Sequence, residues 1–336
     1  MISGNGRSSD KPVNISVLIP TRERPQQLDA CVKSVLASDH KSFEVIVVDQ
    51  SPEPYALIRD PRLHIHHSPA RGKSAALNVA MELASGDLFA FTDDDCTVSE
   101  DWLTRGHERF EAQPEVDLIY GALLAIPHNR SLWFVPEFSP ARLEVVSGAI
   151  RARYRGGAGA NMFARRELFE QIGGFDEAIG PGVSFRSCEE YDIYYRALRA
   201  GAKVLRDPEN AVLHWGKRAH SDGSVQRLIQ GYFFGEGAVL AKHVRSRDLV
   251  ALRISLDIMV RELSFLICSG LLGRNRSGIA LTASWLTGFG RGLRTPVDAS
   301  RRLFAGDAAQ MGSLAQAEPE TRNSKQNPGT VQTKQP

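Results

Sequence analysis

The length, composition and charge of the chain are those of an ordinary globular protein. Its 336 residues are enough for one large domain or two smaller ones. Of these residues 42% are hydrophobic and 24% are charged, as is usual for a globular protein. The formal net charge of +2 gives no sign of a polyanionic partner, so we expect no binding to nucleic acid. No apolar run reaches the roughly 18 residues of a membrane-spanning helix, and residues 1–12 lack the apolar core of a signal peptide.

The cysteines argue for a reducing compartment. There are four, they are far apart, and none forms a CxxC pair: Cys31, Cys96, Cys188 and Cys268. This spacing makes structural zinc and a disulfide framework improbable. We therefore expect reduced thiols in a cytoplasmic protein.

Short apolar runs alternate with amphipathic segments over residues 13–123. In chain order, strands are predicted at 15–20, 43–49, 63–67, 87–93 and 116–123, and helices at 25–38 and 73–86. Strands that are apolar on both faces, with helices between them, favour an α/β fold with a mostly parallel sheet covered on both sides. Ligands of such sheets bind outside the carboxyl ends of the strands, which is where Thr21, Asp49 and Asp93–Asp95 fall.

Three consecutive aspartates, Asp93–Asp95, follow one of these strands. A turn or helix cap needs only one such side chain, and adjacent carboxylates repel one another, so we expect a cation to bind there. A P-loop around Gly72 is excluded because His67 stands where its first glycine is required. The pattern DxDxT at 93–97 leaves open an aspartate-nucleophile phosphatase or phosphotransferase that uses Asp93.

Several longer segments together resemble one known family. They are "ISVLIPTRER", "FEVIVVDQS", "RGKSAALNVAMELASGDLFAFTDDD", "GGAGANMFARRELFEQIGGFDE" and "CEEYDIYYRALRAG", and they cover roughly residues 13–215. In this order they resemble a family 2 glycosyltransferase with the GT-A fold. The resemblance implies an inverting enzyme that moves a sugar from a nucleotide diphosphate donor to a hydroxyl of a glycan, a lipid-linked glycan or a small molecule. A non-catalytic nucleotide-sugar-binding protein is a further alternative.

The resemblance also implies a divalent cation, Mn²⁺ or Mg²⁺, which would stabilise charge on the departing diphosphate. Asp95 corresponds to a metal ligand, and Asp93 and Asp94 belong to the donor-binding set. His214 resembles a histidine that completes the metal shell, although a histidine that ends an apolar run can equally be structural.

Other donor contacts follow from the same resemblance. Asp49 matches an acid that binds the nucleobase, unless it is only a turn residue. Lys73 could meet the diphosphate as a point charge, or remain a solvated lysine. The remaining matches are Pro20, Thr21 and Glu23 beside the nucleoside, Asn78 on the helix of Lys73, and Asn161 in a glycine-rich segment.

The catalytic base falls in the motif Glu189–Asp192. Glu190 takes the position in which the family has aspartate, and its extra methylene leaves open that Asp192 performs this role instead. A third possibility is that these acids merely stabilise the first turn of a helix.

The second half of the chain is predicted to be helical and basic. Residues 223–304 carry 12 Lys or Arg against 5 Asp or Glu, a net charge of +7, whereas the rest of the chain has −5. Such a segment could pack on the catalytic domain with a basic outer face, or make peripheral contact with the inner face of an anionic membrane. We expect a flexible N-terminus at 1–12, the glycosyltransferase domain at 13–222, this extension at 223–304 and a disordered tail at 305–336.

Overall fold

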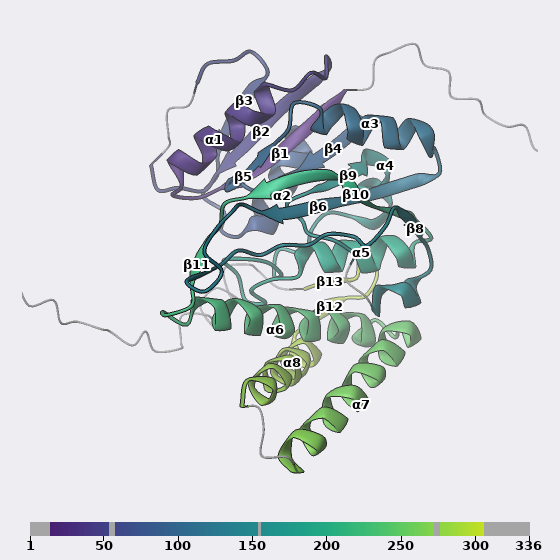
Figure 1. Cartoon of the computed structure of the whole chain (residues 1–336). Helices are drawn as coiled ribbons and strands as arrows, with labels where there is room; N and C mark the ends of the chain where they lie inside the picture. Colours follow the sequence, from purple (N-terminus) through teal and green to yellow (C-terminus); the bar gives the residue numbers. More distant parts are fainter. Residues whose placement is uncertain (1–13, 54–57, 154–155, 272–275, 306–336) are drawn as a thin grey trace, which may run out of the picture.

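The computed structural model describes residues 14–53, 58–153, 156–271 and 276–305 (Figure 1). The expected flexible segment 1–12, and the expected tail apart from Ala305, lie outside these residues.

A nine-stranded sheet forms the centre of the described part, in the order β3-β2-β1-β4-β9-β6-β10-β5, with β8 also paired to β10. β1, β2, β3, β4, β6 and β10 run in one direction, and β5, β8 and β9 run in the other. The expected mostly parallel α/β sheet is therefore confirmed. The strands are β1 (Ile15–Thr21), β2 (Phe43–Asp49), β3 (Leu63–His67), β4 (Leu88–Phe91), β5 (Cys96–Val98), β6 (Val116–Ala125), β8 (Glu144–Val146), β9 (Met162–Arg165) and β10 (Lys203–His214).

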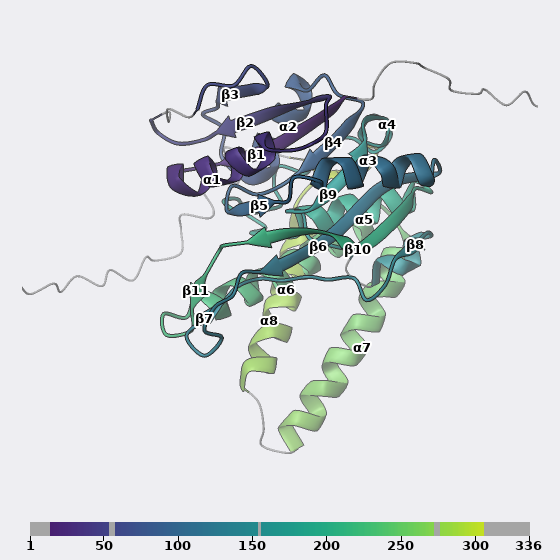
Figure 2. The same cartoon turned by 45° about the horizontal axis from the view of Figure 1, so that its top comes forward.

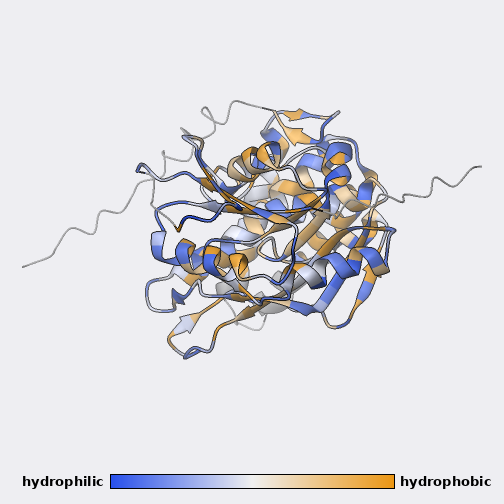
Figure 3. Cartoon of the chain, turned by 90° about the horizontal axis from the view of Figure 1, so that it is seen from above, coloured by the Kyte–Doolittle hydropathy of each residue, from blue (hydrophilic) through white to orange (hydrophobic). Residues whose placement is uncertain are grey.

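Helices cover both faces of this sheet, and the strand sequences explain why. Along β1, Leu18 belongs to one apolar core and its neighbours Val17 and Ile19 belong to the other, because successive side chains of a strand point to opposite faces. The strands are accordingly coloured mainly hydrophobic, and the surrounding helices carry both colours (Figure 3). The covering helices are α1 (Pro25–Leu36) and α3 (Trp102–Ala112) on one face, and α2 (Lys73–Leu83), α4 (Arg166–Ile172) and α5 (Glu189–Arg199) on the other.

Three long helices follow a small ribbon of β7 (Trp133–Phe134) and β11 (Arg218–Ala219): α6 (Ser224–Arg245), α7 (Leu249–Leu271) and α8 (Arg276–Arg294). α6 lies against the body of the molecule, and α7 and α8 project from it (Figures 1 and 2). α8 approaches α6 closely through glycines: a Cβ on Gly237 would lie 2.3 Å from the carbonyl oxygen of Trp285. Larger residues there would push the helices apart.

The described chain ends by returning to the body. β12 (Val297–Asp298) pairs with β13 (Leu303–Phe304), and Phe304 is buried in the core. Its ring stacks on that of Phe185, with centroids 4.5 Å apart. Residues 223–304 are thus bound to the body at both ends.

Candidate active site

A cleft of about 700 Å³ opens at the carboxyl ends of the parallel strands. This is the edge at which an α/β sheet is expected to bind its ligand. Side chains from distant parts of the sequence line it, including Pro20, Thr21, Arg22, Arg24, Gln50, Lys73, Asp93, Asp94, Asp95, Glu189, Glu190, His214 and Arg218.

The three aspartates lie in the turn between β4 and β5, and two basic side chains meet them. The amino group of Lys73 lies 2.5 Å from Asp93, and one guanidinium nitrogen of Arg24 lies 3.0 Å from both Asp94 and Asp95. The hydroxyl of Thr21 donates to Asp94 at 2.7 Å. Burial nevertheless raises the pKa of Asp94 to about 6, although Arg24 partly opposes this. The sequence predicts that Asp93–Asp95 attract positive charge, and in the structure Lys73 and Arg24 supply such charge from the same chain.

Lys73 links these aspartates to α5. Its amino group also lies 3.2 Å from Glu189. Burial alone would lower the pKa of Lys73, but Asp93 and Glu189 raise it well above its ordinary value, so Lys73 remains a cation. The preceding Gly72 has a φ of +99°, and a Cβ there would lie 2.5 Å from Val183. Glycine at this position lets the backbone place Lys73 at the cleft.

His214 faces Asp95 because of strand pairing. β10 runs antiparallel to β5, and His214 is the register partner of Cys96. Its Nδ1 lies 2.8 Å from the carbonyl oxygen of Pro136, which can only accept, so this nitrogen carries the proton and Nε2 points to Asp95 at 3.5 Å. Burial would raise the pKa of Asp95, but it is held below its ordinary value by the hydrogen bond and charge of His214, once Nε2 is protonated as well, and by the charge of Arg24.

Asp95 and His214 form a donor set that fits a divalent cation. Together with Cys96, their ligand atoms lie within 4.8 Å of one another. Burial raises the pKa of Cys96 well above its ordinary value, so it stays a neutral thiol, whereas a carboxylate and an imidazole suit Mn²⁺ or Mg²⁺. A Cβ on Gly216 would lie 2.6 Å from Nε2 of His214 and 2.7 Å from Asp95. Glycine at 216 thus leaves space beside these two ligand atoms.

Glu190 lines the cleft from the first turn of α5. The helix follows Cys188, whose φ of +78° turns the chain into it, and the hydroxyl of Tyr120 donates to the backbone carbonyl of Glu190 at 2.9 Å. A Cβ on Gly159 would lie 3.3 Å from that of Glu190 and 3.6 Å from the amino group of Lys73. The glycine-rich segment therefore passes close to both residues.

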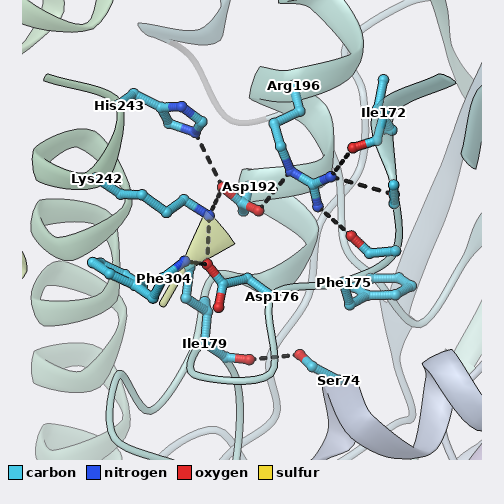
Figure 4. Close-up of polar contacts among 12 residues, drawn as sticks. Ser74, Ile172, Phe175, Asp176, Ile179, Asp192, Arg196, Lys242, His243 and Phe304 are labelled. Carbon is cyan, nitrogen blue, oxygen red and sulfur yellow. Dashed lines mark hydrogen bonds and ion pairs between the residues drawn. The ribbon is translucent and has the colours of Figure 1, made fainter. Parts of the chain in front are cut away.

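Asp192 does not reach the cleft, contrary to the expectation that it could replace Glu190. Successive helix residues are about 100° apart, so Asp192 lies on the far side of α5 from Glu190. There it is 0% exposed and is held by Lys242 at 2.6 Å, Arg196 at 2.9 Å and His243 at 3.1 Å (Figure 4). Burial opposes ionisation, but Lys242 and Arg196 hold the pKa of Asp192 far below its ordinary value. Asp192 is a structural anion.

Two expected donor contacts are also structural. The amide of Asn161 is buried: its nitrogen donates to the carbonyls of Ala122 and Asn210, and its oxygen accepts from Trp102. Asn78 exchanges hydrogen bonds with the backbone of Phe175, outside the cleft. Both amides are used in holding backbone segments, so neither expectation is met.

Comparison with known proteins identifies the fold and the chemistry. A family model described as "Glycosyl transferase family 2" matches residues 16–173. A colanic acid biosynthesis glycosyl transferase of Escherichia coli, WcaA, is 35% identical over 65% of this chain and 78% of its own length. The chain belongs to the family 2 glycosyltransferases.

Other similarities agree with this assignment. A glucosyl-dolichyl phosphate glucuronosyltransferase of Haloferax volcanii is 28% identical over 66% of this chain and 75% of its own length. The solved structure of the mannosyltransferase PcManGT of Pyrobaculum calidifontis, in complex with GDP-Man and Mn²⁺, superposes with a TM-score of 0.53 at 15% identity and covers 85% of this chain and 88% of that one. The expected GT-A-like fold is thereby confirmed, and a glycosyltransferase replaces the phosphatase and the non-catalytic binding protein considered above.

In this glycosyltransferase the four residues expected to contact the nucleoside differ in how exposed they are. Pro20 and Thr21 line the cleft and are buried, and Glu23 is exposed with its amide donating to Ser51. Asp49 is buried: one carboxylate oxygen accepts from the amide of Ser51 at 2.8 Å, and the other is buried without a partner among the described residues. Asp49 therefore acts as a turn residue and keeps one unused acceptor.

Sequence reasoning missed three contributors to the glycosyltransferase cleft. Arg24 stands just before α1 and gave no periodic signal, yet it binds two of the aspartates. Glu189 is one of the three acids in the motif that predicts the base, but its contact with Lys73 has no signal in the sequence. Gly216 could have been noticed, because it follows His214 by two residues in a segment without turn signals.

Proposed function

We propose that the enzyme transfers a sugar from a nucleotide diphosphate donor to an acceptor hydroxyl by a single, inverting displacement assisted by Mn²⁺ or Mg²⁺. The observation that carries the proposal is the placement of Asp95 and His214 on one wall of a cleft that Glu190 also lines. A metal-binding pair and a carboxylate in one cleft match the two needs of this reaction, a stabilised leaving group and a deprotonated nucleophile.

Asp95 and His214 would hold the metal, beside the space that Gly216 leaves. When bound, the ion would act as a Lewis acid that stabilises negative charge on the departing diphosphate. Lys73 adds a fixed positive charge close to Asp93, and Arg24 adds one beside Asp94 and Asp95. The side chain of Arg24 is 46% exposed, so it can reorient towards a phosphate without opening a cavity in the core.

Glu190 would accept the proton of the attacking hydroxyl. Its carboxylate lies in the first turn of α5, where the helix dipole favours the charged form. Both acids line the cleft, but Glu189 is buried and paired with Lys73, so Glu190 is the more exposed acid of the two.

The donor's nucleoside would lie beside Pro20 and Thr21. Asp49 supports this placement because its second carboxylate oxygen lacks a partner among the described residues and could accept from a nucleobase after a small local shift. PcManGT was solved with GDP-Man and Mn²⁺, which agrees with a sugar-nucleotide donor and a divalent ion here.

The acceptor we propose is a glycan, free or linked to a lipid. By name, the relatives belong to colanic acid biosynthesis and glucosyl-dolichyl phosphate glucuronosyl transfer, one a polysaccharide pathway and the other a lipid-phosphate sugar. Phe134, Phe138 and Tyr232 also line the cleft and offer aromatic faces for sugar rings. We assign catalysis to residues 13–222 and a supporting role to 223–304.

The decisive experiment is a panel of nucleotide sugars with Mn²⁺, Mg²⁺ or EDTA, with and without glycan acceptors. Released nucleotide would report turnover, and NMR of the product would report anomeric configuration. We expect metal-dependent release that rises with acceptor, an inverted product, and loss of turnover in Asp95→Asn. Full turnover of Asp95→Asn in EDTA, or retained configuration, would disprove the proposed mechanism.

A further inference from the structure

The helix α7 has two apolar faces, and only one of them is packed. Ala251, Ile254 and Ile258 are buried against the rest of the molecule. The outer stripe, which we define as Leu249, Leu252, Leu256, Val260 and Leu263, recurs every three or four residues and so forms one continuous line on the helix. These five side chains are between 38% and 77% exposed.

An exposed line of this kind differs from ordinary surface leucines. Single exposed apolar residues are normal, but contiguous patches mark contact with another apolar phase. α8 adds Ile279 and Leu286, which are seven residues apart, half exposed and on one face of their helix. α7 and α8 project from the body (Figures 1 and 2), and the exposed fractions of its side chains show that no other described element covers the outer stripe.

The charges near the stripe indicate what covers it. Residues 249–294 contain six arginines and two acidic residues, and no lysine. Arg253, Asp257 and Arg261 are exposed and follow one another at steps of four residues on one side of the stripe, and Arg261 also pairs with Glu262 at 3.1 Å. The positive excess is therefore that of the whole segment 249–294. Apolar side chains bordered by arginines suit the interfacial layer of an anionic bilayer, where apolar groups reach the acyl chains and guanidinium groups meet lipid phosphates.

We infer that α7 and α8 dock on the surface of an anionic membrane, with the outer stripe inserted at its interface. No described helix combines the length and apolar content needed to cross a bilayer. A second copy of the chain fits less well, because a symmetric contact would bring together two segments that each carry more arginines than acids. The inference does not depend on the sugar-transfer reaction.

The test is sedimentation of the full chain with vesicles of phosphatidylcholine alone or with 30% phosphatidylglycerol. We expect binding only to the anionic vesicles, falling steeply as salt rises. The triple variant Leu252→Ser/Leu256→Ser/Val260→Ser should bind at least about tenfold more weakly. Arg253→Gln/Arg261→Gln should also lose about tenfold, because each arginine near an anionic surface contributes to affinity.

A matched control changes three similarly exposed residues elsewhere, Ile65→Ser/Leu83→Ser/Leu143→Ser, and should bind as the wild type does. Circular dichroism melting would verify that each variant folds. The inference is overturned if the wild type ignores anionic vesicles at low salt, or if the stripe variant binds them normally. It is equally overturned if the wild type is a dimer that binds no vesicles and the stripe variant is a monomer, since the stripe would then be a subunit interface.

Discussion

Two clusters of carboxylates and basic groups lie on opposite sides of α5, and they differ in how completely the carboxylates are satisfied. In the buried cluster, Lys242 is 0% exposed and bridges Asp176 and Asp192, and Arg196 and His243 occupy the remaining positions around Asp192 (Figure 4). In the open cluster, Arg24 is half exposed and Gly216 leaves space between Asp95 and His214.

The difference separates structural acids from functional ones. A carboxylate whose oxygens are all bound by buried cations has no capacity for a ligand, and removing any partner leaves a charge in a low dielectric. A carboxylate at a cleft can exchange its partner for a metal ion or substrate, because water solvates its charge while it has no partner. The two aspartate clusters have the same chemistry, so their surroundings decide their roles.

The largest effect is expected at the open side of α5. Glu190→Gln should lower transfer by about 10²–10⁴-fold while donor binding stays near normal, because the amide cannot accept the acceptor's proton. Donor affinity would be measured calorimetrically beside steady-state turnover. Glu170→Gln on α4, an exposed acid outside the cleft, is the control. Unchanged turnover of Glu190→Gln would remove it from the mechanism.

On the buried side of α5, Lys242→Met should lower the free energy of unfolding by about 3–5 kcal/mol, since Asp176 and Asp192 would each lose a buried cation. Urea unfolding followed by circular dichroism would measure this. Lys33→Met removes an exposed lysine paired with Asp29 and should cost less than about 0.5 kcal/mol. Similar losses in both variants would show that the buried cluster is not the anchor we describe.

A pH dependence should distinguish the buried cluster further. Burial lowers the pKa of His243 from 6.5 to about 4, although Asp192 opposes this. As pH falls from about 6.5 to 4, the unfolded chain gains a proton that the folded chain refuses, so about 3 kcal/mol of stability should be lost. His243→Gln should lack this component when unfolding free energies at pH 7 and pH 4.5 are compared. If the unfolding free energy of His243→Gln falls with pH as steeply as that of the wild type, other groups cause the loss of stability in acid.

The smallest effect is expected beside Asp95. Gly216→Ala would place a methyl group in the space between Asp95 and His214, and Mn²⁺ affinity should fall by about 10–100-fold with little change in stability. Electron paramagnetic resonance of free Mn²⁺ gives this affinity directly. Gly231→Ala, in α6 with open space around it, is the matched control. Equal Mn²⁺ affinities would place the metal elsewhere.

The sheet was predictable from sequence because its signals are local. The runs 15–20 and 43–49 are mostly apolar, with Ser16, Glu44 and Asp49 as their polar residues, and strands buried on both faces favour this. The positions of Asp93–Asp95 followed from the end of such a run and from the rule that ligands meet strand ends.

The roles of single polar residues were less predictable, because their partners are distant in sequence. Asp192 is two residues from Glu190 and also carries a carboxyl group, and two of the three side chains that make it structural, Lys242 and His243, come fifty or more residues later. Asn161 likewise depends on Trp102 and Asn210, which sequence patterns do not connect to it. Local pattern gives a strand's burial, whereas a side chain's hydrogen-bond partners come from the tertiary fold.

The return of β13 to the body has a consequence for the order of events during synthesis. Asp176 accepts from both the amino group of Lys242, at 2.7 Å, and the backbone amide of Phe304, at 2.8 Å. A ribosome delivers the sheet strands β1–β10 long before either donor, and chains generally begin to fold from the N-terminus. Until α6 emerges, Asp176 and Asp192 lack the amino group of Lys242, although Arg196 already lies four residues from Asp192. The ring of Phe185 likewise lacks the stacking of Phe304 until the end of the described chain. The last strand of the described chain therefore completes the core against which α5, the helix that carries Glu190, is packed.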